Sequence, residues 1–212
     1  MDNPTKALLT RAYNTKSLCA LHIDLQACFY CEAIPHEKQA FTNTAHLSKS
    51  LRPLNIENVW AVCSPQYKIP IKAKFFIPGI AESNFAVVSP DKNEWVLPKN
   101  NNNLFCEKDK KAYQPLLPET ILTDGIHFDQ CVTDTIVGAF QHRSKINKPL
   151  NIVLLTDCTD SSASAEQKIS YIKKALKKAH PEINIETNTN LNLTHANSNE
   201  RIELFKQLAL AA

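Results

Sequence analysis

Short apolar runs that alternate with longer helical stretches constrain the fold of this chain more than any other feature. The fifth run, Leu150–Thr156, is apolar almost throughout, which suits a parallel strand buried on both faces. The predicted strands are Ser17–Asp24, Asn58–Cys63, Glu94–Leu97, Ile121–Gly125, Leu150–Thr156 and Ile183–Thr187. The predicted helices are Glu37–Leu51, Asp129–Arg143, Ala163–His180 and Ser198–Leu210. This strand–helix alternation predicts a doubly wound α/β sheet.

The length and composition of the chain fit one globular domain. Its 212 residues suffice for a full hydrophobic core, and 43% apolar and 21% charged residues are ordinary for a globular protein. These values exclude a wholly disordered chain, a collagen-like chain and a coiled coil. The sequence has no internal repeat and no linker, so we expect a single domain over residues 1–212.

Charge and glycine content exclude several classes of binding protein. The net charge of +3 is lower than a dedicated nucleic-acid binder usually carries, so we expect no nucleic-acid partner. The three glycines, Gly79, Gly125 and Gly138, lie too far apart for a G-x-G-x-x-G or P-loop motif. Each glycine is instead a candidate position of backbone constraint.

The N-terminal sequence and the cysteine content indicate a cytoplasmic protein. Residues 1–16 lack the apolar region of a secretory signal peptide. No apolar run approaches the ~20 residues that a membrane helix needs, so we expect no membrane partner. Seven cysteines, an odd number, disfavour a disulfide-stapled secreted scaffold and favour a reducing compartment.

Three residues at predicted strand ends form a candidate catalytic set. Asp24 ends the first strand, Lys99 follows the third, and Cys131 lies at the start of the helix after the fourth. In open α/β sheets, ligands bind beyond the carboxyl ends of the strands. A helix N-terminus and a lysine are expected to lower the pKa of a thiol, and a carboxylate can accept and return its proton. The set suits acyl-transfer hydrolysis through a thioester.

Four motifs around these residues resemble, in order and spacing, those of the isochorismatase-like cysteine hydrolases. The motifs are Asp24-Leu25-Gln26-Ala27-Cys28-Phe29, Glu94-Trp95-Val96-Leu97-Pro98-Lys99 with Phe105 beyond it, Gly125-Ile126-His127-Phe128-Asp129-Gln130-Cys131-Val132, and the strand Ile152–Asp157. The agreement extends from about Ser17 to Thr187. Each motif alone is weak, but four in the same order are fairly specific.

The resemblance implies both a fold and a reaction. The fold is a three-layer α/β/α sandwich around a six-stranded parallel sheet of Rossmann-like topology. The implied triad has Cys131 as nucleophile, Asp24 as general base and then acid, and Lys99 as the group that stabilises negative charge. The implied reaction is hydrolysis of a non-peptide, amide-type C–N bond in a small molecule, without a cofactor. Relatives of this kind form oligomers, so we expect a homodimer or homotetramer.

The resemblance also implies an oxyanion hole and a substrate pocket. The backbone N–H groups of His127 and Cys131 would be the donors, helped by a cis peptide bond between Ile126 and His127. Substrate-binding residues would be Ile126, His127, Phe128, Phe29 and Phe105. The irregular segment Ser64–Ala81 would form part of the pocket wall. Its lysines, Lys68, Lys72 and Lys74, either attract an anionic substrate or are simply solvated.

Several positions depart from the family pattern and keep other functions open. Ala27-Cys28 replaces an Asn-Asp pair, Phe128 replaces a threonine near the expected oxyanion hole, and Asn103 ends an asparagine tract where a serine is common. One alternative is therefore a binding or regulatory protein that keeps the fold without turnover. Another is a vinyl-ether hydrolase of the isochorismatase type, for which the cysteine is unnecessary.

A metal site, a redox motif and a Cys–His dyad are weaker interpretations. The metal-dependent relatives carry histidines after the second strand, whereas this chain has none between His46 and His127, so we expect no metal. Cys28 and Cys31 form a C-x-x-C pair that we interpret as coincidence rather than as a thioredoxin-like motif. His127 lies four residues before Cys131, but we prefer Asp24 as the base.

Overall fold

A computed structural model gives the structure of residues 3–63, 85, 87–99, 101–105 and 117–211. Its centre is a six-stranded, wholly parallel sheet in the order β3-β2-β1-β4-β5-β6. The strands are β1 (Leu18–Ile23), β2 (Glu57–Cys63), β3 (Trp95–Lys99), β4 (Thr120–Gly125), β5 (Leu150–Thr159) and β6 (Leu191–Ala196). The predicted six-stranded parallel sheet is therefore confirmed.

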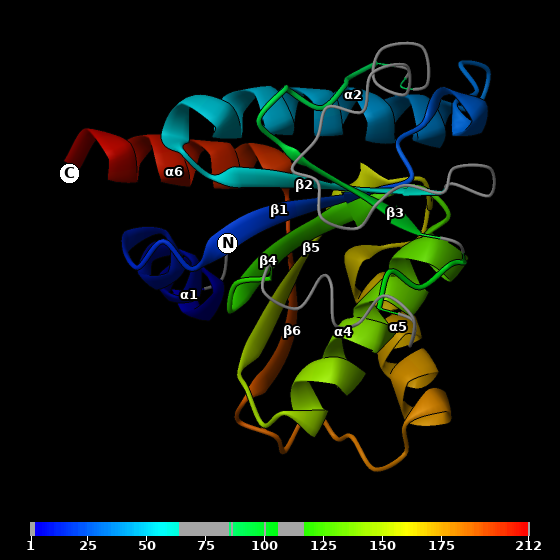
Figure 1. Cartoon of the computed structure of the whole chain (residues 1–212), viewed down its shortest axis with the longest axis vertical. Helices are drawn as coiled ribbons and strands as arrows, with labels where there is room; N and C mark the ends of the chain where they lie inside the picture. The colour runs from blue at the N-terminus through cyan, green and yellow to red at the C-terminus, as the bar shows by residue number, and fades with distance from the viewer. Residues whose placement is uncertain (1–2, 64–84, 86, 100, 106–116, 212) are drawn as a thin grey trace.

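Helices cover both faces of the sheet and make three layers (Figure 1). The α-helices are α1 (Asn3–Asn14), α2 (Pro35–Leu51), α4 (Thr133–Lys145), α5 (Ala165–Ala179) and α6 (Ser198–Ala211). The short helices are η1 (Ala27–Phe29), η2 (Arg52–Leu54) and the π-helical turn η4 (Phe128–Val132). None of the helices in these described ranges is both long and apolar enough to cross a membrane.

Alternate residues of the central strands point to opposite faces of the sheet and pack in two different hydrophobic cores. Leu21 and Ile23 of β1 pack in the core that includes α4 and α5. Ala20 of the same strand packs in the core that joins α1, α2 and α6. Since β1 and β4 are buried along their whole length, their apolar residues point to both faces, as in parallel sheets covered on two sides. The predicted three-layer sandwich is confirmed.

The sixth strand lies later in the chain than predicted. Residues Ile183–Thr187 are not a strand, and β6 is formed by Leu191–Ala196 instead. Backbone turns take up the hydrogen bonds of the earlier segment, from Ile183 N–H to His180 O and from Asn188 N–H to Asn184 O. The buried Ile183 packs in the core beside α5, so its apolar character reflects packing rather than sheet pairing.

Helix α1 was not predicted, and other predictions cannot be compared with the structure. Leu9 and Ala12 of α1 are buried, at the i, i+3 spacing of a helical face, in the core shared with α2 and α6. The predicted pocket wall Ser64–Ala81, with its three lysines and Gly79, lies outside the described residues.

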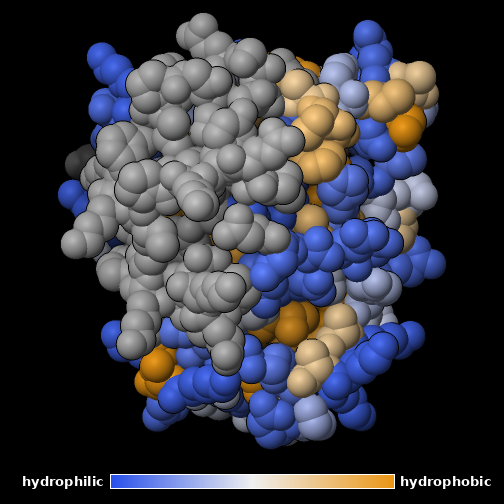
Figure 2. All heavy atoms as spheres, turned by 45° about the vertical axis from the view of Figure 1, so that its right-hand side comes forward, coloured by the Kyte–Doolittle hydropathy of each residue, from blue (hydrophilic) through white to orange (hydrophobic). Residues whose placement is uncertain are grey.

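Large apolar side chains reach the surface at isolated positions in the described ranges. Val87, Ile146, Tyr171 and Leu210 are exposed, and Leu210 is the most exposed of them. On the face shown in Figure 2, hydrophobic residues lie in small groups between hydrophilic ones. Scattered exposure of this kind is normal for a folded domain.

A chain of buried polar side chains links adjacent strands of the sheet. His22 of β1 contacts Asp124 of β4 through Nδ1 at 2.9 Å and Asn58 of β2 through Nε2 at 2.9 Å. The amide nitrogen of Asn58 donates to Glu94, just before β3, at 2.7 Å. The amide oxygen of Asn58 therefore faces His22, so Nε2 of His22 must donate. Arg52 completes the chain by pairing with Glu94.

The environment of His22 favours its protonated form. Burial, the largest single effect, disfavours the charged imidazole, but the Asp124 carboxylate and the hydrogen bonds with Asp124 and Asn58 together raise the pKa of His22. A raised pKa means that the folded state holds a proton that the unfolded state loses near pH ~6.5. The resulting stabilisation is complete below that pH and is lost as the pH rises toward the folded pKa of His22.

We therefore expect the free energy of unfolding to fall with pH above ~6.5, with a contribution from His22 of up to ~1.4 kcal/mol per pH unit. Urea unfolding at several pH values should show this slope in the wild type and a smaller slope in His22→Gln. His46→Gln, at an exposed position of α2, serves as the matched control and should keep the wild-type slope. Equal slopes in wild type and His22→Gln would contradict the assignment.

Candidate active site

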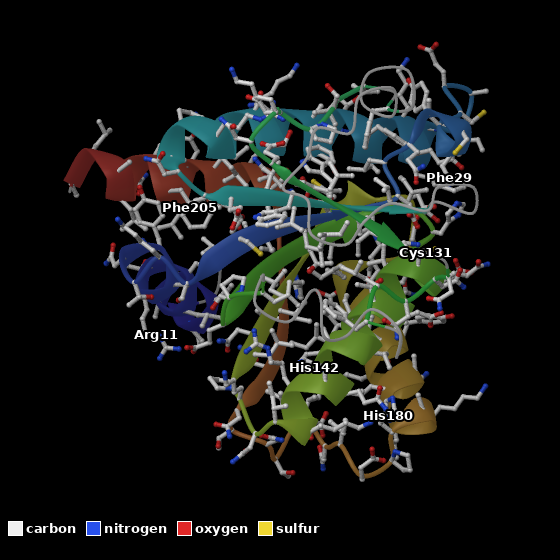
Figure 3. All side chains as sticks on the ribbon, in the orientation of Figure 1. Arg11, Phe29, Cys131, His142, His180 and Phe205 are labelled. Atoms are coloured by element: carbon white, nitrogen blue, oxygen red, sulfur yellow. The ribbon has the colours of Figure 1, made fainter. Side chains whose placement is uncertain are left out.

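The three predicted catalytic residues meet at the carboxyl edge of the sheet. Asp24 follows β1, Lys99 ends β3, and Cys131 lies in η4 after β4. The Nζ atom of Lys99 lies 2.7 Å from Oδ2 of Asp24, and both side chains are fully buried. The thiol of Cys131 is close enough to both for their charges to change its pKa. Phe29 and Cys131 lie at the same end of the sheet, opposite the end where Arg11 and Phe205 lie (Figure 3).

Backbone geometry ends β1 at Asp24. Its φ of 57° leaves the extended region, and its N–H donates to the carbonyl of Ala61. Aspartate is one of the few residues that adopt positive φ at small cost. Apart from the Nζ atom of Lys99, no group in the described part of the chain makes a close polar contact with the Asp24 carboxylate. The carboxylate therefore has acceptor capacity left for a proton, as a general base needs.

The thiol of Cys131 is neutral at rest. Burial, followed by the negative charge of Asp24, raises the pKa of Cys131 to about 12. The positive charge of Lys99 lowers this pKa but does not offset the other effects. The sequence-based prediction of a lowered thiol pKa is therefore wrong for the free protein. If this thiol acts as a nucleophile, a base must take its proton as it attacks rather than before, and Asp24 is the nearby candidate.

Residues 101–103 of the asparagine tract, which was predicted as a loop, lie beside Cys131, the candidate nucleophile. Lys99 Nζ donates to the backbone carbonyl of Asn101 at 3.2 Å. The thiol of Cys131 donates to Oδ1 of Asn102 at 3.6 Å. Thr135 Oγ1 donates to the Asn102 carbonyl at 3.2 Å and accepts from the N–H of Leu104 at 3.3 Å. Sequence reasoning missed Asn102, although its position three residues after Lys99 was a usable signal.

A glycine on α4 makes room for this loop. A Cβ atom at Gly138 would lie 2.2 Å from Oδ1 of Asn103, far inside van der Waals contact. The same Oδ1 accepts a hydrogen bond from the N–H of Phe105 at 2.8 Å, so it holds the loop in shape. The close approach of Asn103 to α4 therefore requires glycine at this position.

The turn before the nucleophile differs from the prediction. The structure has no cis peptide bond in the described residues, so the Ile126–His127 bond is trans and the predicted cis bond is wrong. Gly125 has a φ of 136°, and a Cβ there would lie 2.2 Å from the carbonyl oxygen of Ile23. The Ile126 N–H donates to this same oxygen at 3.0 Å. Gly125 therefore allows the tight contact of β4 with β1 that positions the turn.

Asp160 occupies the backbone amides of this turn. The N–H of His127 donates to Oδ2 of Asp160 at 2.8 Å, and the N–H of Phe128 donates to Oδ1 at 2.9 Å. The register explains the contact, because Thr159 of β5 pairs with Gly125 of β4 and Asp160 follows directly. The His127 amide, predicted as an oxyanion donor, is therefore already bound. Sequence analysis did not single out Asp160.

Of the five predicted substrate-binding residues, two lie at the surface of the site. The rings of Phe29 and His127, both half-buried, meet edge to face with centroids 4.7 Å apart. Ile126 and Phe105 are buried in the core. The Phe128 ring is also buried and packs against α5, 5.8 Å from the ring of Tyr171 and 5.9 Å from the Nζ atom of Lys168.

The other residues that the sequence analysis singled out, Asp157, Cys28 and Cys31, lie outside the group formed by Asp24, Lys99 and Cys131. Asp157 accepts from the N–H of Ser198 at 2.9 Å and from its hydroxyl at 2.6 Å, at the start of α6. Cys28 and Cys31 are exposed cysteines. Within the described ranges, no three His, Cys, Asp or Glu side chains are grouped so that they could hold a metal ion.

Comparisons with known proteins support the fold. No protein-family profile matches the sequence, and no curated protein sequence matches it. Among solved structures, an isochorismatase-like hydrolase from Alkaliphilus metalliredigens is 15% identical, with 88% of this chain and 97% of that chain covered and a TM-score of 0.56. An N-carbamoylsarcosine amidase from Thermoplasma acidophilum is 14% identical, with 85% and 96% covered and a TM-score of 0.54.

A third structure shares the fold under a different activity. The MAR1 ribonuclease from Caenorhabditis elegans is 15% identical, with 91% of this chain and 88% of that chain covered and a TM-score of 0.52. The chain therefore has the fold of the isochorismatase-like hydrolases, as its motifs predicted. Since proteins with this fold are named for different activities, the reaction must be argued from the site.

We expect Asp24→Asn to lower the apparent pKa of Cys131, because the substitution removes the negative charge that opposes the thiolate. Lys99→Met should raise it, because it removes the positive charge that favours the thiolate. Alkylation by iodoacetamide across pH, with the modified site assigned by mass spectrometry, measures both shifts. The exposed Cys28 and Cys31 are internal references. An unshifted Cys131 profile in Asp24→Asn would show that the carboxylate and the thiol are not coupled.

Gly138→Ala should destabilise the protein by ~1–3 kcal/mol, the usual cost of overpacking, because its methyl group would collide with Asn103. Urea unfolding of Gly138→Ala, Asn103→Ala and the double variant forms a mutant cycle. In the Asn103→Ala background the glycine substitution should cost much less. If Gly138→Ala lowered the free energy of unfolding equally in the wild type and in Asn103→Ala, the collision with Asn103 would not be the cause.

Proposed function

We propose that this protein is a metal-independent cysteine hydrolase that cleaves a non-peptide C–N bond of a small molecule through a thioester. The observation that carries the proposal is the buried Asp24–Lys99 ion pair beside the thiol of Cys131. A nucleophile, a base and a fixed positive charge at the carboxyl edge of a parallel sheet are the groups that this chemistry needs. The shared fold with the N-carbamoylsarcosine amidase supports the choice of a C–N bond.

The first half of the reaction forms the acyl-enzyme. As Sγ of Cys131 attacks the substrate carbonyl carbon, its proton passes to the Asp24 carboxylate. The S–C bond forms, and the electron pair of the C=O double bond moves to oxygen. Lys99 is paired with Asp24 at rest. Once Asp24 is protonated, the positive charge of Lys99 offsets the negative charge that has moved to the substrate oxygen, so the net charge of this buried site does not change.

The second half releases both products. The tetrahedral intermediate collapses, the C–N bond breaks, and Asp24 gives its proton to the leaving nitrogen as ammonia or an amine leaves. Water then attacks the thioester while Asp24 accepts one of its protons. The C–S bond breaks, the proton passes to Sγ, and a carboxylic acid is released. Asp24 thus alternates between base and acid, which its position beside the thiol permits.

The test is a screen of small primary amides and carbamoyl compounds for release of ammonia. Cys131→Ala should lower turnover at least ~10³-fold, because removal of a nucleophile abolishes the covalent route. Mass spectrometry of a stopped reaction should show an acyl group on Cys131. Cys28→Ala, which removes an exposed thiol outside the triad, is the matched control and should keep full activity. Turnover that survives in Cys131→Ala would contradict the thioester route.

Two rival functions are separated by the same variant. The bound state of the His127 amide favours a binding or regulatory protein without turnover, since one expected oxyanion donor is occupied. Such a protein would turn over none of the amides and would bind small molecules equally well with Cys131→Ala. A vinyl-ether hydrolase would retain its activity in that variant, because its chemistry needs no thioester.

The setting of the reaction is part of the proposal. We propose that the protein acts in the cytoplasm as a homodimer or homotetramer on a small-molecule substrate. The resemblance of its motifs to those of oligomeric hydrolases supports this. Light scattering of the full chain in solution measures the molar mass directly.

A further inference from the structure

The proposed reaction needs hydrogen-bond donors for the oxygen that becomes negative. In acyl transfer, donors aimed at this oxygen provide much of the rate enhancement. In this structure the N–H groups of His127 and Phe128 are both bound by the carboxylate of Asp160, at 2.8 and 2.9 Å. A substrate oxygen would have to displace the Asp160 carboxylate before it could accept from these two N–H groups. A different donor close to Cys131 would meet the need without that cost.

Asn102 has a free donor next to the nucleophile. Its Oδ1 lies 3.6 Å from Sγ of Cys131, and Asn102 is an exposed residue. Its Nδ2 group belongs to the same planar carboxamide and donates to no other group among the described residues. The Oδ1 atom of this side chain therefore contacts the thiol, while its Nδ2 group has no acceptor among the described residues.

The backbone that carries Asn102 is held firmly on three sides. Lys99 binds the carbonyl of Asn101, and Thr135 binds the carbonyl of Asn102 and the N–H of Leu104. Beyond it, Asn103 packs into the space that Gly138 leaves on α4. These contacts fix the backbone position of the donor before the reaction, so that the carboxamide has only to turn about its side-chain torsions to reach the substrate oxygen.

We propose that Asn102 is the side-chain oxyanion donor of this site, an inference that rests on the proposed cysteine-hydrolase function. At rest its Oδ1 accepts the hydrogen of the neutral thiol. As Asp24 takes that proton during the attack, Oδ1 loses its hydrogen-bond donor and faces the electron-rich sulfur, which is unfavourable. Rotation of the carboxamide then presents Nδ2–H to the substrate oxygen as the S–C bond forms and the C=O electron pair moves onto that oxygen. An asparagine can serve both stages, because its side chain holds an acceptor and donors.

Asp160 acts in this scheme as a positioning residue. Its two oxygens hold consecutive amides at the start of η4, which carries Cys131. Those bonds fix the turn that precedes the nucleophile while leaving the task of stabilising the oxyanion to Asn102.

The test separates donation to the oxyanion from reactivity of the thiol. Propionaldehyde adds to a cysteine thiol as a hemithioacetal: the S–C bond forms, and the thiol proton ends on the former carbonyl oxygen. Its affinity, measured by protection of Cys131 from iodoacetamide, depends on donors to that oxygen. Alkylation by iodoacetamide itself depends on the thiolate and needs no such donor.

Asn102→Leu should weaken propionaldehyde binding at least tenfold while Cys131 still alkylates with a similar pH profile. With an amide substrate, the same variant should lower kcat by ~10²–10³-fold, the usual effect of losing one oxyanion donor, with a much smaller change in KM. Asn102→Asp, which keeps the shape and the acceptors but loses the donor, should also weaken aldehyde binding. Asn192→Leu, at an exposed position of β6, is the matched control and should behave as wild type.

Two outcomes would overturn the proposal and are distinguishable. Wild-type aldehyde affinity in both Asn102→Leu and Asn102→Asp would remove Asn102 from the reaction and leave the cysteine-hydrolase function intact. A wild-type protein that propionaldehyde does not protect, and that releases no ammonia from any amide, would overturn the proposed function together with this inference.

Discussion

The buried ion pair between Asp24 and Lys99 is the interaction on which the rest of the site depends. Both side chains are fully buried, and in such surroundings a single charge costs several kcal/mol unless its partner is present. The two residues come from β1 and β3, which are separated by β2, so the pair forms only if three strands are in register. A slip of one residue would turn either side chain to the opposite face. The charge chemistry of the site and the strand order are thus specified together.

The central strands could be predicted from the sequence, and the ends of the sheet could not. β1, β4 and β5 are buried on both faces, so their apolar runs could be assigned to parallel strands inside the sheet. At the edge, the sixth strand was predicted at Ile183–Thr187, whereas the pairing of Leu191 with Leu150 places it at Leu191–Ala196. Helix α1 was missed because its short segment mixes apolar residues with threonine, lysine, arginine and asparagine.

The position of the site could be predicted, and its electrostatics could not. Asp24, Lys99 and Cys131 stand at strand ends, where topology alone brings residues together. The raised pKa of Cys131 follows from burial and from the exact partners of Asp24, which no spacing reveals. Asp160 was invisible for a related reason: its partners are backbone amides, which have no signature in the sequence, and its reach depends on an irregular register between β4 and β5.

The contact of Asp160 with the turn also has a consequence for selectivity among ions. Exposed amides at the start of a helix attract phosphate, sulfate and other inorganic anions, which are abundant in any cell. Here a tethered carboxylate fills that position, at an effective concentration that a dissolved anion does not reach. While Asp160 holds them, these two amides are not available to dissolved anions, and the turn before Cys131 keeps its shape.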